Sequence, residues 1–151
     1  MKGFIAMNIN DVSKWFLTKQ SMTNKKVQKL CYYSVAWGHA LMGKSIVDDS
    51  KFEAWVHGPA SPTLYKTYKK HGWNDIPKES AAPTFDNDVK ELLEAVWFTY
   101  GDKDGNELEV LSHSELPWVE ARKGLPATEN SSNEISAKTM SSYYNSIKTA
   151  E

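Results

Sequence analysis

Apolar residues recur three and four positions apart through much of the chain, and this spacing predicts a mostly helical protein. The longest such segment is predicted to run from about residue 24 to residue 43, with Thr23 as its N-cap and Gly43 at its C-terminal end. Its buried stripe is expected to comprise Val27, Leu30, Cys31, Ser34, Gly38, Leu41 and Met42.

The same periodicity predicts shorter helices on both sides of this segment. They are expected over residues 11–20, 62–71, 107–115 and 132–148, and from residue 84 or 86 to residue 100, with a helical turn at Pro117. Asn10 is predicted to cap the first of them, and Ser131 with Glu134 is predicted to form a capping box for the last.

One segment alternates instead of following the helical period. In residues 52–56, Phe52, Ala54 and Val56 share one face, which predicts a strand. We expect it to pair with residues 46–47 across a turn, and the prolines that follow at 59 and 62 to end the pairing. The predicted class is α+β and predominantly helical: about six helices around one core, with a small β-hairpin near residues 46–57.

Length and composition favour one domain. The 151 residues, 40% hydrophobic and 25% charged, suit a single globule. We expect residues 1–7 to form a flexible N-terminal arm and residues 8–151 to form that domain. The apolar run of residues 4–7 is too short for a signal peptide or a membrane span. With only one cysteine, Cys31, the chain fits a reducing compartment, so a cytoplasmic location without membrane contact is expected.

Few residues are candidates for catalysis or for metal binding. The four histidines, His39, His57, His71 and His113, show no metal-ligand spacing, so neither a metal nor a cofactor is expected. Cys31 lies on the apolar stripe, where burial keeps a thiol neutral and unreactive. Glu53 and His57 fall on one strand face and could serve as an acid–base pair, but a structural polar corner is the favoured interpretation. No enzymatic activity is predicted.

Basic residues cluster in two places. Lys25, Lys26 and Lys29 open the long helix, and residues 65–71 interleave tyrosines with lysines, a pattern typical of nucleic-acid binding. The net charge of −1 argues against a general nucleic-acid binder, and solvated helix faces explain the same lysines. Nucleic acid is therefore an unlikely partner.

Several pieces in a fixed order resemble one family. They are TNKKVQKLCYYSVAWGHALMGK (23–44), FEAWVHGP (52–59), PTLYKTYKKHG (62–72), a helix ending in Tyr100-Gly101, Ser112-His113, and the segment from Pro117 to Arg122. Over roughly residues 8–148 the chain resembles the Panacea domain of SocA-like and phage-associated GepA-like proteins.

This resemblance implies a bacterial or prophage antitoxin that neutralises a cognate protein toxin by direct contact. The implied toxins include translation-blocking and tRNA-modifying enzymes. Some family members act as proteolytic adaptors, and a small nucleic-acid-binding regulator is the third alternative. The resemblance implies no catalytic activity, and it leaves open a homo-oligomer or a hetero-oligomer with the toxin.

The resemblance also identifies the residues that match the family motif. The family motif is matched by Lys26, Gln28, Lys29, Leu30, Tyr32, Tyr33, Phe52, Glu53, Ala54, Trp55, Gly58 and Pro59. At His57 the sequence departs from the family, which often has an aromatic residue there. From aromatic and basic character, we predict partner contacts at Trp55, His57, Tyr65, Lys69, Trp73 and Trp118.

Overall fold

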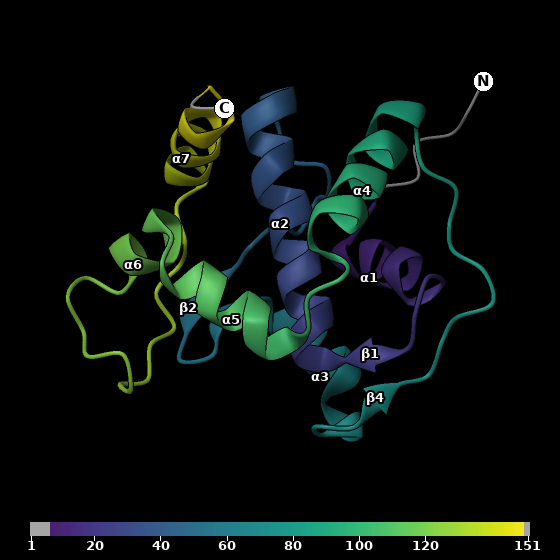
Figure 1. The fold of residues 1–151 in the computed structure, drawn as a ribbon, viewed down its shortest axis with the longest axis horizontal. Helices are drawn as coiled ribbons and strands as arrows, with labels where there is room; N and C mark the ends of the chain where they lie inside the picture. The colour runs from purple at the N-terminus through teal and green to yellow at the C-terminus, as the bar shows by residue number, and fades with distance from the viewer. Residues whose placement is uncertain (1–6, 150–151) are drawn as a thin grey trace.

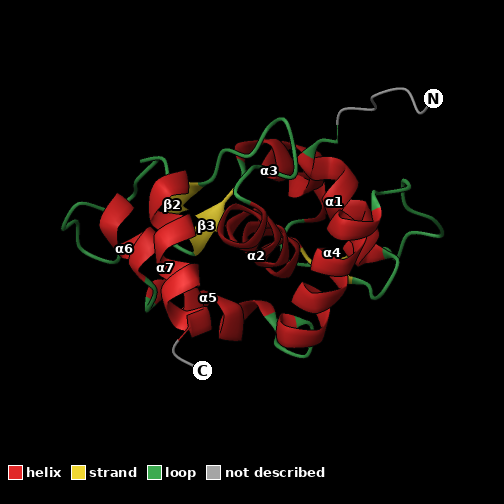
Figure 2. Ribbon diagram, turned by 90° about the horizontal axis from the view of Figure 1, so that it is seen from above, coloured by secondary structure: helices red, strands yellow, loops and turns green. Residues whose placement is uncertain are grey.

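The fold is organised around one central helix, α2 (Asn24–Met42), in a computed structural model that describes residues 7–149. Seen along its axis, α2 lies in the middle of the molecule with other helices on its sides (Figure 2). Every residue from 26 to 36 is buried, so this part of the helix has no solvent-facing side. The predicted caps are confirmed: the Thr23 hydroxyl accepts from the Lys26 amide at 3.2 Å, and Gly43 is left-handed with φ 68°.

Six further α-helices within residues 7–149 surround α2, and Figure 1 shows α7 and α4 on opposite sides of it. α2 packs against α7, α5, α4, α1 and α3. The bounds of these six helices and of the short 3-10 helix η1 are α1 (Ile9–Leu17), α3 (Pro62–Tyr68), η1 (Lys69–His71), α4 (Asn87–Tyr100), α5 (Gly105–His113), α6 (Leu116–Ala121) and α7 (Ala137–Thr149).

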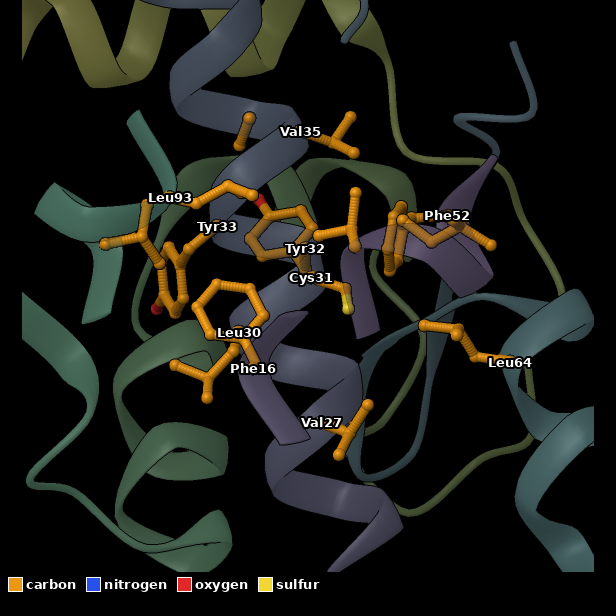
Figure 3. Close-up of a cluster of buried hydrophobic side chains, with 14 of the residues drawn as sticks. Phe16, Val27, Leu30, Cys31, Tyr32, Tyr33, Val35, Phe52, Leu64 and Leu93 are labelled. Atoms are coloured by element: carbon orange, nitrogen blue, oxygen red, sulfur yellow. The ribbon is translucent and has the colours of Figure 1, made fainter. Parts of the chain in front are cut away.

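Aromatic side chains fill the core on both sides of α2 (Figure 3). Tyr33 stacks on Tyr100 of α4 with ring centroids 4.0 Å apart, and Tyr32 meets Phe52 edge-on at 5.6 Å. Tyr33 and Tyr144 both donate their hydroxyls to buried Glu115, at 2.8 and 2.9 Å. Much of the aromatic content of the chain therefore serves packing.

Two small antiparallel ladders complete the described fold. β1 (Met22–Thr23) pairs with β4 (Asp75–Ile76), and β2 (Glu53–Trp55) pairs with β3 (Gly58–Ala60). β2 is also held on its other edge, where the Ala54 amide donates to Asn133 O at 2.8 Å and the Ile135 amide donates to Phe52 O at 2.8 Å. The hairpin therefore lies between α2 and the segment that leads into α7.

The predicted fold class, α+β and predominantly helical, is confirmed, whereas the partner of the predicted strand was wrong. Residues 53–55 pair forward with 58–60 and not back with 46–47. Pro59 does not end the ladder. It stands opposite Ala54 at a position where the backbone groups of the two strands point away from each other, so no N–H from residue 59 is required. Ile46 and Val47 are buried without forming a strand.

Other local predictions need correction. α1 begins after Asn8, which forms a capping box with Asp11, and not after Asn10. Ser131 and Glu134 do not cap a helix, because residue 134 bridges to Glu53 of β2 and α7 starts only at Ala137. Leu41, expected on the buried stripe, is 50% exposed because it lies near the free end of α2.

Residues 1–6 of the predicted N-terminal arm lie outside the described residues. Among the helices of residues 7–149, none combines the length and apolar character needed to cross a membrane.

Candidate functional site

A groove of about 650 Å³ opens beside the N-terminal turns of α2. One wall comes from the β2–β3 hairpin, a second from α3 and the segment after it, and a third from residues 130–132. The lining residues are Asn24, Lys25, Gln28, Lys29, Trp55, Val56, His57, Gly58, Ala60, Tyr65, Lys69, Gly72, Trp73, Asn130, Ser131 and Ser132. Segments far apart in the sequence thus meet at one concave surface.

Three aromatic rings stand around this groove. Trp55 is half-buried, Tyr65 is 46% exposed and Trp73 is 73% exposed. Trp55 and Tyr65 meet edge-to-face with their centroids 5.4 Å apart. On the other side, the Trp73 ring lies 5.8 Å from the His57 ring and 5.5 Å from the Lys25 ammonium. Large exposed rings that already touch their neighbours offer contact area at a low entropy cost.

The groove is basic although the whole chain carries a net charge of −1. Lys25, Lys29, Lys69 and His57 line it, and none of the lining residues is Asp or Glu. A carboxylate outside the lining, Glu109 of α5, accepts from Lys25 at 2.7 Å and contacts His57 Nδ1 at 3.1 Å. Burial raises the pKa of Glu109, but these two partners outweigh burial and leave its pKa lowered.

Lys29 is the most unusual group of the site. Its side chain is buried, and its ammonium donates to Pro59 O of β3 at 3.2 Å. Burial lowers the pKa of Lys29 to about 7, with Glu109 opposing the change and Lys25 adding to it. Gly58 covers the same side chain with φ 106°, and a Cβ there would stand 2.7 Å from Lys29 Cε. The tight hairpin turn thus packs directly against the buried lysine.

The residues of the family motif are mostly structural in this fold. All of them are buried except Trp55, which is half-buried. Gln28 illustrates the role: its side-chain amide donates to Ser61 O at 3.1 Å and accepts from the Ser61 amide at 2.7 Å. Lys26 donates to Gly101 O at 2.7 Å and to Gln20 at 2.9 Å. The motif therefore joins α2 to the hairpin and to the α4–α5 turn.

Five of the six residues predicted as partner contacts lie together in the groove: Trp55, His57, Tyr65, Lys69 and Trp73. Trp118 does not join them and lacks the exposed ring that was expected. It is 6% exposed, stacks on His113 with centroids 4.0 Å apart, and donates to Trp55 O at 2.8 Å. Its place in the fold is to support the backbone beneath Trp55.

The acid–base pair considered from the sequence is not formed. Glu53 accepts from Trp55 Nε1 at 2.7 Å and contacts Lys51 at 3.2 Å, whereas His57 turns to Glu109. Cys31 is fully buried, and burial raises the pKa of its thiol, as expected for an unreactive cysteine. Within residues 7–149, no three His, Cys, Asp or Glu side chains gather as a metal site would require.

Sequence reasoning missed the buried lysines. Lys26 and Lys29 were assigned to a solvated face, and their burial removes them from any exposed basic surface for nucleic acid. Their neighbour Lys25, which contacts Glu109 and Trp73, was also not linked to the aromatic residues. No local pattern shows these contacts, because they join residues about fifty and about eighty positions apart in the chain.

Comparison with known proteins places this chain in a family. The model of the "Antitoxin SocA-like, Panacea domain" family matches residues 27–119. Antitoxin SocA of Caulobacter vibrioides (strain NA1000 / CB15N) is 30% identical over 112 residues, which cover 64% of this chain and 58% of that protein. The match thus spans little more than half of that relative. No solved structure matches the chain significantly. Because the family model covers most of the chain, including most of α2, the hairpin and most of the groove, the protein belongs to the SocA-like antitoxin family of Panacea domains.

Proposed function

We propose that this protein is an antitoxin that neutralises a cognate protein toxin by binding it directly through the groove beside α2. The observation that carries the proposal is the convergence of Trp55, Tyr65 and Trp73 with three lysines on one concave surface of an antitoxin-family chain. Exposed tryptophan and tyrosine rings around a hollow are typical of the residues that dominate protein–protein binding energy.

The proposed mechanism is occlusion, with no covalent step. The toxin would lay a segment into the groove, and the surrounding surface would cover the toxin's active or substrate-binding face. A stable complex of this kind buries about 1,200–2,000 Å² in total, more than the groove alone supplies. Surface around the groove would therefore contribute to the contact area.

The groove is pre-organised for such binding. Trp55 is fixed at its indole by Glu53 at 2.7 Å and at its carbonyl by Trp118 at 2.8 Å. His57 is held by Glu109 at 3.1 Å. Because these side chains are already ordered, less conformational entropy is lost when a partner binds. We propose binding with little backbone movement on the antitoxin side.

The test is a growth-rescue assay with the product of the neighbouring open reading frame. Expressed alone in bacterial cytoplasm, that product should stop growth, and co-expression of this protein should restore it. A translation-blocking or tRNA-modifying toxin would also show restored protein synthesis. A harmless neighbour, or arrest that persists despite equal antitoxin expression, refutes the antitoxin role.

A matched pair of variants tests the surface. Trp73→Ala removes a ring that is 73% exposed inside the groove, and Phe98→Ala removes a ring that is 90% exposed on α4 outside it. We expect Trp73→Ala to lose rescue and Phe98→Ala to retain it. Toxin levels measured in the same cells separate occlusion from proteolytic delivery, since a proteolytic adaptor would make the toxin disappear.

A further inference from the structure

Two buried polar atoms at the groove have bonding capacity that the described residues leave unused. A charged lysine has three N–H donors. Among residues 7–149, the hydrogen bond found for the Lys29 ammonium is the one to Pro59 O, at 3.2 Å. Asn24, five residues earlier on α2, has a buried side-chain oxygen without a hydrogen-bond partner in the described part of the chain. Both residues line the groove.

Leaving such groups unpaired is costly. A buried polar atom without a partner costs about 1–3 kcal/mol, and more when it is charged. The charge of Glu109 favours the Lys29 ammonium, but in the described part of the chain the Glu109 carboxylate contacts Lys25 at 2.7 Å and His57 at 3.1 Å and is not a hydrogen-bond partner of Lys29. A ligand that brings an acceptor to Lys29 and a donor to Asn24 would satisfy both atoms at once.

We propose that the groove binds a peptide segment of the toxin by receiving an Asp or Glu side chain at Lys29, with a backbone N–H of that segment donating to Asn24 and an adjacent apolar side chain packing against the Trp55 and Tyr65 rings. This inference rests on the proposed antitoxin function and specifies what the groove recognises. It accounts for the absence of acidic residues among those that line the groove.

The donor and acceptor pattern favours a peptide over nucleic acid. A phosphodiester offers acceptors for lysine but no hydrogen to donate to the Asn24 oxygen. Nucleic-acid backbones are also bound by solvated lysines, whereas Lys29 is 2% exposed at the base of the groove. A compact carboxylate on a flexible side chain can reach such a site, and its charge-assisted hydrogen bond is among the stronger ones in proteins.

The arrangement predicts a pH dependence of binding. The pKa of Lys29 is lowered to about 7 by burial, in a setting that also includes Glu109 of α5, Lys25 of α2 and His113 of α5. A bound carboxylate favours the charged ammonium and raises the pKa of Lys29 in the complex. The affinity gain is therefore complete below about pH 7 and is lost as the pH rises through the raised pKa.

The experiment uses two capped dipeptides that differ only in charge: N-acetyl-tryptophanyl-glutamate amide and its glutamine counterpart. Each is titrated into the isotopically labelled protein and followed by NMR at the amides of α2 and at the ε-methylene of Lys29. We expect the glutamate peptide to bind at least about tenfold more tightly and to raise the pKa of Lys29. Lys29→Met should abolish the preference without removing the weak binding of the indole.

Equal binding of the two peptides, or an unchanged pKa of Lys29, overturns the inference. A thymidine oligonucleotide that shifts the same resonances more strongly than the glutamate peptide also overturns it. If Lys29→Met fails to fold, the titration of the wild-type Lys29 signal decides alone. If the peptide titration fails but the protein rescues growth, the carboxylate site is refuted and the antitoxin function stands. If the glutamate peptide is preferred but the protein does not rescue growth, the antitoxin function is refuted and the carboxylate site stands.

Discussion

Gly58 is the position where the hairpin, the buried lysine and the groove depend on one another most closely. Its φ of 106° lies in the region that L-residues rarely adopt, and a Cβ there would stand 2.7 Å from Lys29 Cε and 3.0 Å from Ser112 Oγ. Gly58→Ala must therefore strain the backbone and shift the end of the Lys29 side chain.

The expected loss of stability is the sum of the backbone strain and the cost of moving Lys29. Backbone strain of this kind costs about 1–3 kcal/mol. Moving Lys29 weakens its 3.2 Å bond to Pro59 O, which adds about 1 kcal/mol or more. We expect Gly58→Ala to lower the free energy of unfolding by roughly 3 kcal/mol, a large part of the total stability of a domain this size.

Gly43→Ala provides the matched control. Gly43 also has a positive φ, 68°, but an added Cβ would meet nothing within 4 Å. This variant should lose only the left-handed term, about 1 kcal/mol. Urea unfolding followed by tryptophan fluorescence measures both variants, with equal slopes showing that the stability itself has changed. Equal losses in the two variants would contradict the contact between Gly58 and Lys29.

Four further predictions test the surrounding fold. Lys29→Met should show that the wild type gains about 2 kcal/mol over the variant between about pH 7 and about pH 9, because the lowered pKa makes the unfolded state bind more protons in this window; unfolding curves for both proteins at each pH measure this, and a constant difference contradicts it. Glu115→Gln should become progressively more stable than the wild type as the pH rises from acid to neutral, since burial raises the pKa of Glu115 and the folded state resists its ionisation; the melting temperatures of both proteins across that range test the sign. Gln28→Ala should cost about 2–4 kcal/mol, because it leaves the buried amide and carbonyl of Ser61 unpaired, and denaturant unfolding measures the loss. Trp73→Ala should change stability by less than about 0.5 kcal/mol because the ring is 73% exposed, so thermal melting separates its effect on binding from an effect on folding.

Local signals in the sequence were sufficient for much of the helical framework. Helix α2 was predicted with both of its caps, because the Thr23 hydroxyl and the left-handed Gly43 act on residues within one turn of themselves. The residues selected by aromatic character also converge, since Trp55, Tyr65 and Trp73 lie around one groove. Fold class and most helix positions thus follow from periodicity and capping.

The errors arose where distant segments determine the structure. The second edge of β2 is paired with residues about eighty positions later, and this pairing replaces the predicted capping box at Ser131. Lys26 and Lys29 look solvated on a helical pattern, but α2 is enclosed on its sides, so residues on its polar stripe are buried as well (Figure 2). Trp118 was misassigned for the same reason, because its cover comes from α5 and the β2 backbone.

The central claim is that the groove binds the toxin directly, and affinity between purified proteins tests it most closely. The purified product of the neighbouring open reading frame, titrated calorimetrically, should bind the wild type and Phe98→Ala alike. Trp73→Ala should bind roughly thirtyfold more weakly, as expected when an exposed tryptophan dominates an interface. Tight binding that Trp73→Ala leaves unchanged, or the absence of any binding to the wild type, would contradict the account.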